Sequence, residues 1–121
     1  MNQVTVGSAD MARAEAFYTT LGLRLIVRDD HYLRFECPDG EATFSVDFAA
    51  GPTPGSVTVY FECDDLDGDC ARLVAAGVAF EQGPEDMPWL WREARLRDPD
   101  GHAVCLFHAG THRTHPPWRL A

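Results

Sequence analysis

Two tryptophans and two charged residues stand together in the stretch PWLWRE, which begins at Pro88. An indole ring offers a flat apolar surface with one N–H donor, so Trp89 and Trp91 could stack on a planar ligand. Cationic groups of a ligand are also attracted to the faces of such rings. The alternative is structural, because a Pro-Trp pair entering a strand can cap a core and Arg92 with Glu93 can form a solvated ion pair. The residues alone leave both interpretations open.

Nucleophilic catalysis is not indicated by the remaining reactive residues. Cys105 has no fixed base or cation predicted beside it, and a catalytic cysteine needs a stabilised thiolate. The sequence contains no Gly-rich phosphate loop and no Ser-His-Asp arrangement in a recognisable context. Asp47 and Glu62 could act as an acid and a base in a metal-free isomerase if their pKa values were shifted.

An internal repeat supplies the elements that must position these residues. Two segments of helical spacing, 10–22 and 65–77, each begin with an aspartate that can cap a helix and end with a glycine that tolerates the left-handed conformation. Their apolar stripes are Met11, Ala14, Tyr18 and Leu21 in the first, and Leu66, Cys70, Leu73 and Val74 in the second.

One alternating strand pattern precedes each helix and three follow it. The predicted strands are 2–7, 23–28, 32–37 and 42–48 in the first half, and 56–63, 78–82, 91–97 and 102–107 in the second. The same turn signature, PDG, precedes the last strand of each half. The chain therefore reads as two βαβββ modules of class α+β, about 1–48 and 57–108, with a Pro/Gly-rich linker at 49–56 and a tail at 109–121. Neither module could bury its own helix and sheet, so we expect the two to pack as one domain.

Composition and charge exclude several partners. The 121 residues carry a formal charge of −9 and show no basic stripe, which argues against nucleic acid. No apolar run is long enough to span a bilayer and the N-terminus lacks a signal-peptide pattern, so we expect a cytoplasmic protein without a membrane partner. The four cysteines are irregularly spaced, and we expect free thiols that mostly pack in the core.

The paired βαβββ repeat, with AFYTTLGL ending the first helix and RDPDGHAVCLF forming the last hairpin, resembles the glyoxalase/bleomycin-resistance/extradiol-dioxygenase superfamily, the vicinal oxygen chelate fold. The resemblance covers residues 4–108. It implies two curled mixed sheets that form a cup around a ligand with helices outside, and dimers are common in this superfamily. The fold alone does not fix the activity, since it hosts isomerases, dioxygenases, epimerases, thiol transferases and drug-binding proteins.

Most enzymes of this superfamily hold a metal with His and Glu side chains at four strand positions. The resemblance places those positions on Gln3, Ser45 (or Phe44 if the hairpin is one residue shorter), Thr58 and Cys105. None is an imidazole or a carboxylate, whereas a catalytic divalent site needs about three such ligands. We therefore expect no cofactor, with a divalent metal in a non-standard set as the alternative. The tail histidines His108, His112 and His115 are expected to be solvated, because Gly110 and two prolines argue against a helix that would align them.

Strand alternation names the side chains that share a face with those four positions. They are Thr5, Thr43, Asp47, Tyr60, Glu62, Ala103 and Phe107. The opposite face is uniformly apolar and makes a core, with Val4, Val6, Phe44, Val46, Val59, Phe61, Val104 and Leu106. A lining of hydroxyls, carboxylates and aromatics suits a ligand with a planar body and a few polar or cationic groups.

PWLWREARLRDPDG also resembles the bleomycin-resistance branch, where a PWG-RE motif precedes the same turn. That branch sequesters a planar, cationic antibiotic in grooves of its dimer, and this sequence departs from it by having Leu90 and Trp91 in place of the glycine. We therefore predict a metal-free, homodimeric, small-molecule-binding protein of this type. The predicted ligand-binding residues are Gln3, Asp47, Thr58, Tyr60, Glu62, Trp89, Trp91, Arg92, Cys105 and Phe107.

Two alternatives stay open. One is an isomerase, lyase or dioxygenase of the same superfamily that acts on a small metabolite, using an unusual metal set or the pair Asp47 and Glu62. The other is a diverged scaffold or accessory domain whose cup is filled by its own side chains. Independently of these, Phe107 and Trp118 could belong to a dimer contact rather than to a ligand site.

Overall fold

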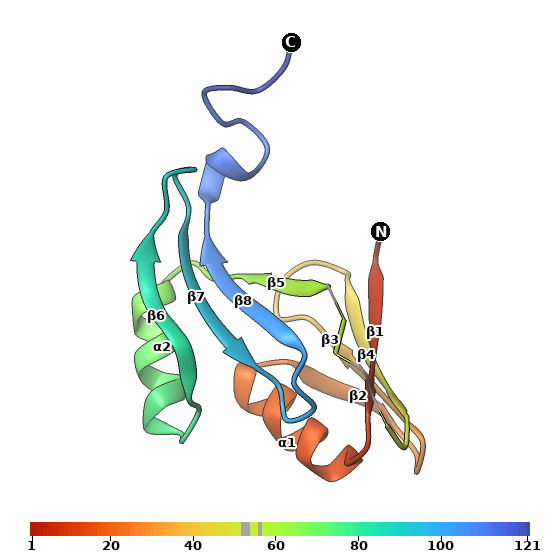
Figure 1. Cartoon of the computed structure of the whole chain (residues 1–121). Coiled ribbons are helices and arrows are strands. Elements are labelled where there is room, and N and C mark those ends of the chain that lie inside the picture. Colours follow the sequence, from red (N-terminus) through yellow and green to blue (C-terminus); the bar gives the residue numbers. More distant parts are fainter. Residues whose placement is uncertain (52–53, 56) are drawn as a thin grey trace. The chain divides into compact units, whose positions relative to one another are not determined.

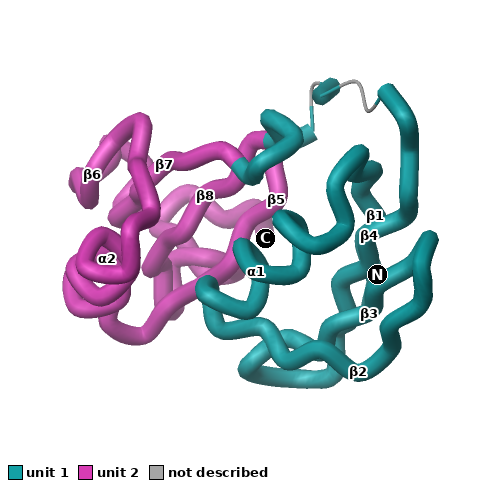
Figure 2. The backbone as a smooth tube through the Cα atoms, turned by 90° about the horizontal axis from the view of Figure 1, so that it is seen from below, with its two compact units in different colours: residues 1–57, 98–102 teal, residues 58–97, 103–121 magenta. Residues whose placement is uncertain are grey.

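The computed structural model describes residues 1–51, 54–55 and 57–121 and divides into two compact units (Figure 2). Unit 1 contains residues 1–57 and 98–102, and unit 2 contains residues 58–97 and 103–121. The predicted linker at 49–56 lies partly outside the described residues.

Both units contain the predicted strand–helix–three-strand succession (Figure 1). In unit 1 the elements are β1 (Gln3–Ser8), α1 (Met11–Leu21), β2 (Arg24–Arg28), β3 (Tyr32–Glu36) and β4 (Thr43–Phe48). In unit 2 they are β5 (Thr58–Glu62), α2 (Leu66–Ala75), β6 (Phe80–Asp86), β7 (Arg92–Arg97) and β8 (Ala103–His108), followed by the 3-10 helix η1 (Gly110–Arg113). The α+β class and the two βαβββ modules are confirmed.

The two sheets have the same topology. Unit 1 has the strand order β1-β4-β3-β2 and unit 2 has β5-β8-β7-β6. In each, the first and last strands of the module pair in parallel, and the other pairs are antiparallel. The sheets are therefore mixed, as the resemblance implied.

The helix boundaries have the predicted caps. The Asp10 carboxylate accepts from the Arg13 backbone N–H at 3.0 Å, and Asp65 accepts from Gly68 at 3.1 Å. These bonds satisfy donors that the first turn of a helix leaves free. At the end of α1, Gly22 adopts φ 111°, a left-handed conformation that a side chain would strain.

Each helix packs on the apolar face of its own sheet. In unit 1 the Tyr18 ring of α1 lies 4.5 Å from the Phe44 ring and 5.9 Å from the Phe35 ring, measured between centroids. In unit 2, α2 buries Leu66, Cys70 and Leu73. The prediction that Val74 lies on the buried stripe of α2 was wrong, because 60% of this residue is exposed. The buried stripe of this ten-residue helix is narrower than the four positions that were assigned to it.

The turn between β7 and β8 belongs to unit 1 rather than to the strands that it joins. Asp98 in this turn is buried and accepts a 2.6 Å hydrogen bond from the Tyr18 hydroxyl. Its other oxygen accepts from the backbone N–H groups of Asp100 and His102. The His102 ring is hydrogen-bonded to the Gly7 carbonyl at 2.7 Å. The second PDG signature therefore completes the core of unit 1.

All four cysteines are free thiols; Cys70 and Cys105 are buried, whereas Cys37 and Cys63 are only partly so. Among the described residues, no helix has the length and apolar character needed to cross a membrane.

Candidate functional site

The candidate site lies on the face of the unit 2 sheet opposite α2. Tyr60 and Arg95 flank Cys105 in register, on β5 and β7 respectively, and Glu93 lies opposite Phe107. Paired residues of adjacent strands share a face, so these side chains form one surface. Thr58, opposite Ala103, and Glu62, opposite Phe107, extend it along β5. The predicted alternation of β5 and β8 is therefore confirmed.

An aromatic set covers one end of this surface. The Trp91 ring is stacked on the Phe107 ring, with centroids 4.7 Å apart and planes at 20°. The Tyr60 ring presents its edge to both, at 6.3 Å from Trp91 and 5.7 Å from Phe107. Phe107 is buried beneath the other two, whereas Tyr60 is 45% exposed. Trp91 and Tyr60 thus offer aromatic surface to a ligand, and Phe107 supports them.

A buried ion pair lies beside the aromatic set. Glu93, which is 1% exposed, accepts from Arg95 Nη2 at 2.6 Å and from Trp89 Nε1 at 2.7 Å. The same Arg95 nitrogen lies 3.3 Å from the Tyr60 hydroxyl, and the guanidinium stands over the Tyr60 ring at 5.5 Å. Trp89 is therefore tied to the sheet through its N–H, and Arg95 is held in a fixed orientation.

Arg92 lies on the other face of the sheet. Its guanidinium pairs with Asp67 of α2 and with Asp86, both at 3.0 Å. The structural alternative, a solvated ion pair of Arg92 with Glu93, does not form: Glu93 pairs with Arg95, because neighbouring residues of a strand point to opposite faces. The same alternation places Arg92 away from the ligand surface that Trp91 and Glu93 share.

Leu90 explains how the motif accommodates the loss of its glycine. It adopts φ 71°, the left-handed conformation that glycine favours, in the loop that joins β6 to β7. Hydrogen bonds from Leu90 N to Met87 O at 3.0 Å and from Met87 N to Trp91 O at 2.7 Å close this loop. The strained residue thus stands between the two tryptophans in this loop.

Cys105 and Gln82 lie on either side of Arg95. Burial raises the pKa of the Cys105 thiol to about 12, so the group is neutral at physiological pH. Gln82 of β6 is the register partner of Arg95, and its amide Nε2 is buried without a partner among the described residues. A buried N–H donor without an acceptor is costly, and an oxygen of a ligand would satisfy it.

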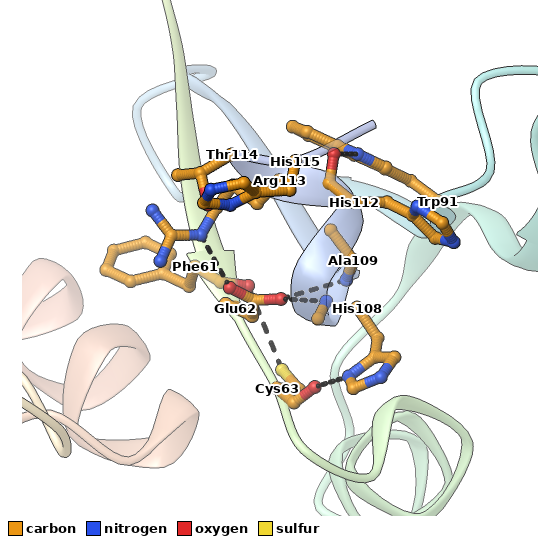
Figure 3. A network of polar contacts seen from close by, with 11 residues as sticks. Phe61, Glu62, Cys63, Trp91, His108, Ala109, His112, Arg113, Thr114 and His115 are labelled. Atoms are coloured by element: carbon orange, nitrogen blue, oxygen red, sulfur yellow. Dashed lines mark hydrogen bonds and ion pairs between the residues drawn. The ribbon is translucent and has the colours of Figure 1, made fainter. Parts of the chain in front are cut away.

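Glu62 is occupied by the tail rather than free for a ligand (Figure 3). Its carboxylate accepts from the backbone N–H groups of Ala109 and Gly110, at 2.8 and 2.9 Å, and from Arg113 Nε at 2.9 Å. Partial burial alone would raise the pKa of Glu62, but these hydrogen bonds outweigh it and hold the pKa below its usual range. The carboxylate therefore caps η1 and is a weak base.

The tail is more ordered than the sequence indicated. η1 forms despite Gly110, and the carbonyl of His112 accepts from Trp91 Nε1 at 3.3 Å. His108 and His115 are exposed as predicted, whereas His112 is half-buried. The prediction of fully solvated tail histidines was therefore wrong for His112.

The corresponding face of unit 1 has its own polar set. Gln3 lies opposite Thr43 and accepts from its hydroxyl at 2.7 Å. Ser45 is fully buried, and its hydroxyl is hydrogen-bonded to that of Tyr32 at 2.8 Å. Arg34 lies opposite Ser45, while Asp47, opposite Tyr32, is exposed.

The four positions that the superfamily uses for metal ligands do not fit a divalent cation here. Gln3 is bound to Thr43, Ser45 to Tyr32, and the Cys105 thiol holds its proton. Arginines lie opposite the fourth-strand positions in both units, where their positive charge opposes a metal ion. Within the described part of the chain, no three His, Cys, Asp or Glu side chains are grouped as a metal site.

Sequence reasoning did not single out Arg95, Gln82, Tyr32 or Arg34. The signal for the arginines was present, because counting back across each PDG turn places them opposite Cys105 and Ser45. The sequence indicates the ion pair of Arg95 with Glu93 less clearly. A spacing of two residues in a strand predicts that the side chains share a face, but it does not predict that the carboxylate is buried.

Comparison with known proteins agrees with this fold. The family model described as "Glyoxalase/Bleomycin resistance protein/Dioxygenase superfamily" matches residues 1–106, and the chain belongs to this superfamily. No curated protein matches the sequence significantly.

Three solved structures illustrate the range of its relatives. TnmS3, an antibiotic binding protein from Streptomyces sp. CB03234, is 31% identical over 90% of this chain and 94% of its own, with a TM-score of 0.76. The bleomycin resistance determinant encoded on the transposon Tn5 is 23% identical over 89% and 96%, with a TM-score of 0.75. Lactoylglutathione lyase from Agrobacterium tumefaciens is 22% identical over 89% and 92%, with a TM-score of 0.74. The last two similarities establish the fold only.

Proposed function

We propose that this chain is a small-molecule-binding protein of the bleomycin-resistance type, which sequesters a planar ligand without a metal and without converting it. The observation that carries the proposal is the aromatic set of Trp91, Tyr60 and Phe107 on the unit 2 sheet. Aromatic rings that are half-exposed yet held by stacking lose little side-chain freedom when a ligand binds. The antibiotic-binding relative at 31% identity supports this class of function.

Hydrogen-bond donors beside the rings would orient the ligand. Arg95 is fixed by Glu93, and the amide of Gln82 lies in the neighbouring strand without a partner among the described residues. A carbonyl or ether oxygen at the edge of a planar ligand would satisfy them. Because Arg95 and Glu93 neutralise each other, this part of the surface suits an uncharged acceptor.

The observations argue against an enzyme that uses Asp47 and Glu62 as acid and base. A general base needs a pKa near the working pH, whereas the hydrogen bonds to Glu62 lower its pKa further. The Cys105 thiol holds its proton and is a poor nucleophile. The proposal therefore assigns binding, not catalysis, to this face. It includes a cytoplasmic homodimer without a nucleic-acid partner.

Tryptophan fluorescence tests the proposal. Bleomycin, mitomycin C and 2-anthracenecarboxamide would be titrated into the protein and into the variant W89F/W118F, in which Trp91 is the remaining tryptophan. We expect saturable quenching by at least one compound, retained in W89F/W118F and lost in Trp91→Phe. Phenylalanine keeps the stacking on Phe107, so Trp91→Phe should fold.

The response of Trp118 provides the contrast, because this residue lies in the tail and is 58% exposed. Quenching that disappears in Trp118→Phe but persists in Trp91→Phe would place the ligand elsewhere. No quenching by any planar compound, together with tight binding of another ligand class, would refute the proposal.

A further inference from the structure

The two halves carry an arginine at the same register position. Arg34 of β3 lies opposite Ser45 of β4, and Arg95 of β7 lies opposite Cys105 of β8. Ser45 and Cys105 are the fourth-strand positions to which the family resemblance assigns a glutamate ligand. Each half therefore presents a neutral side chain and a guanidinium where the superfamily's metal enzymes present a carboxylate.

The two arginines differ in how their charge is balanced. Arg95 forms an ion pair of 2.6 Å with the buried Glu93. Arg34 is half-buried and forms no ion pair with any residue that the structure describes. A half-buried guanidinium that no carboxylate neutralises keeps a positive charge that an anionic group of a ligand could pair with.

Neighbouring side chains hold Arg34 in place. Its Nε donates to the Tyr32 hydroxyl at 2.8 Å, and its guanidinium carbon lies 5.3 Å from the centre of the Tyr32 ring. The Tyr32 hydroxyl is in turn hydrogen-bonded to the buried Ser45, which lowers the pKa of Tyr32 and favours its role as an acceptor. The terminal nitrogens of Arg34 form no hydrogen bond with the described residues, so the end of the guanidinium fork is available.

The nearby carboxylates on this sheet do not neutralise it. Asp47 lies on the same face, opposite Tyr32, but is exposed and forms no ion pair with Arg34. Glu36, two residues along β3, pairs with Arg24 at 3.4 Å. The unit 1 face thus places a fixed positive charge beside Ser45.

We propose that Arg34, held by Tyr32 and Ser45, forms a subsite on the unit 1 sheet for an anionic oxygen group, a carboxylate or a phenolate. The inference goes beyond the proposed function, which rests on unit 2 alone, and it names an organic acid rather than a cationic compound as the class of ligand that unit 1 binds. The free end of the guanidinium matches two oxygens of a carboxylate, and such charge-assisted bonds are stronger than neutral ones.

Three probes that share one ring system test the charge preference. The affinities of 2-anthracenecarboxylate, 2-anthracenecarboxamide and 2-anthracenylmethylammonium would be measured by calorimetric titration. We expect the carboxylate to bind about tenfold more tightly than the carboxamide, which corresponds to one charge-assisted contact. In Arg34→Met this ratio should fall to about one, and in Arg34→Lys it should be intermediate. Arg13→Met, which removes an exposed arginine of α1, should keep the wild-type ratio.

The outcomes separate this inference from the proposed function. Equal binding of all three probes, or preference for the ammonium compound, would overturn the subsite while leaving the binding function intact. An equal loss of ratio in Arg13→Met would also overturn it, because the preference would then come from general surface charge. Absence of binding for all three would contradict the proposed function instead.

A second measurement tests the subsite without the aromatic set. Sodium benzoate would be titrated while the Nε–H resonance of Arg34, assigned by its loss in Arg34→Lys, is followed by NMR. We expect a saturable shift of this resonance and none of the Arg24 resonance. No shift, or equal shifts of both, would overturn the subsite.

Discussion

At the scale of single residues, Arg34 and Arg95 occupy equivalent register positions but differ in the partner that balances their charge. Arg95 meets the carboxylate of Glu93, whereas Arg34 meets only the hydroxyl of Tyr32. A buried carboxylate that loses its cation is strongly destabilising, while removal of a half-buried charge without a partner is not. Arg95 therefore stabilises the fold through its ion pair and can also contact a ligand. The charge of Arg34 forms no such pair and should contribute little to stability.

This contrast predicts the stability of two matched variants. Arg95→Met should lower the free energy of unfolding by about 2 kcal/mol, less than for a fully buried pair because a third of the Arg95 side chain is exposed. Arg34→Met should change it by less than about 1 kcal/mol, the scale of one neutral hydrogen bond. Urea unfolding followed by circular dichroism measures both, and equal losses would contradict the assignment.

The buried hydroxyl of Tyr18 makes a second residue-scale prediction. Tyr18→Phe removes the donor from the buried Asp98 and should cost about 2 kcal/mol, as for hydrogen bonds to charged groups. Tyr60→Phe removes an exposed hydroxyl with a 3.3 Å contact and should cost less than about 0.5 kcal/mol. A similar loss in both, measured by thermal unfolding, would show that the Asp98 contact is unimportant.

At the scale of elements, the loop that joins β6 to β7 carries strain. Leu90 is a non-glycine residue at φ 71°, and 47% of it is exposed. Leu90→Gly should therefore raise the free energy of unfolding by about 1 kcal/mol, since a strained left-handed residue costs on this order. Leu90→Ala keeps the Cβ and should bring no gain. Stabilisation by alanine equal to that by glycine would show that the side chain, not the backbone, is unfavourable.

The tail element should respond to pH through Glu62. Its pKa is lowered in the folded chain, so the stabilisation of η1 is present above the unfolded pKa of about 4.3 and is lost as the pH falls through the folded value. Hydrogen exchange of the Ala109 and Gly110 amides should therefore accelerate, after correction for intrinsic rates, as the pH falls through the lowered pKa of Glu62. Glu62→Gln should accelerate it already at pH 7, and an unchanged pH profile in Glu62→Gln would contradict the cap.

The elements were largely predictable from the sequence and the site only in part. Strand alternation placed Tyr60, Cys105 and Phe107 on one face, because the period of two follows from backbone geometry. The tail contact of Glu62 with Arg113 joins residues 51 positions apart, and no local pattern encodes it. Arg92 was predicted to bind a ligand because it stands next to the tryptophans in the PWLWRE motif. Its position beside Glu93 in a strand already indicated that the Arg92 side chain points to the opposite face from Glu93.

At the scale of the whole molecule, the internal repeat reflects the membership of the superfamily and also shows where this chain differs from the superfamily's metal enzymes. Two modules of identical topology identify the superfamily, and their fourth strands carry Ser45 and Cys105 opposite arginines. Neutral donors beside guanidinium groups favour oxygen atoms of a ligand over a metal ion. We therefore expect this protein to bind its ligand without a metal ion.

Calorimetric titration of 2-anthracenecarboxylate into the protein tests whether ligand binding needs a metal. One sample would be treated with EDTA, and others would be supplemented with Zn²⁺, Ni²⁺ or Mn²⁺. We expect saturable binding in the EDTA-treated sample. The Kd values should agree within about twofold across all samples, which corresponds to a difference of about 0.4 kcal/mol in binding free energy. Binding that is absent after EDTA and restored by one metal, or absent in every sample, would contradict this expectation.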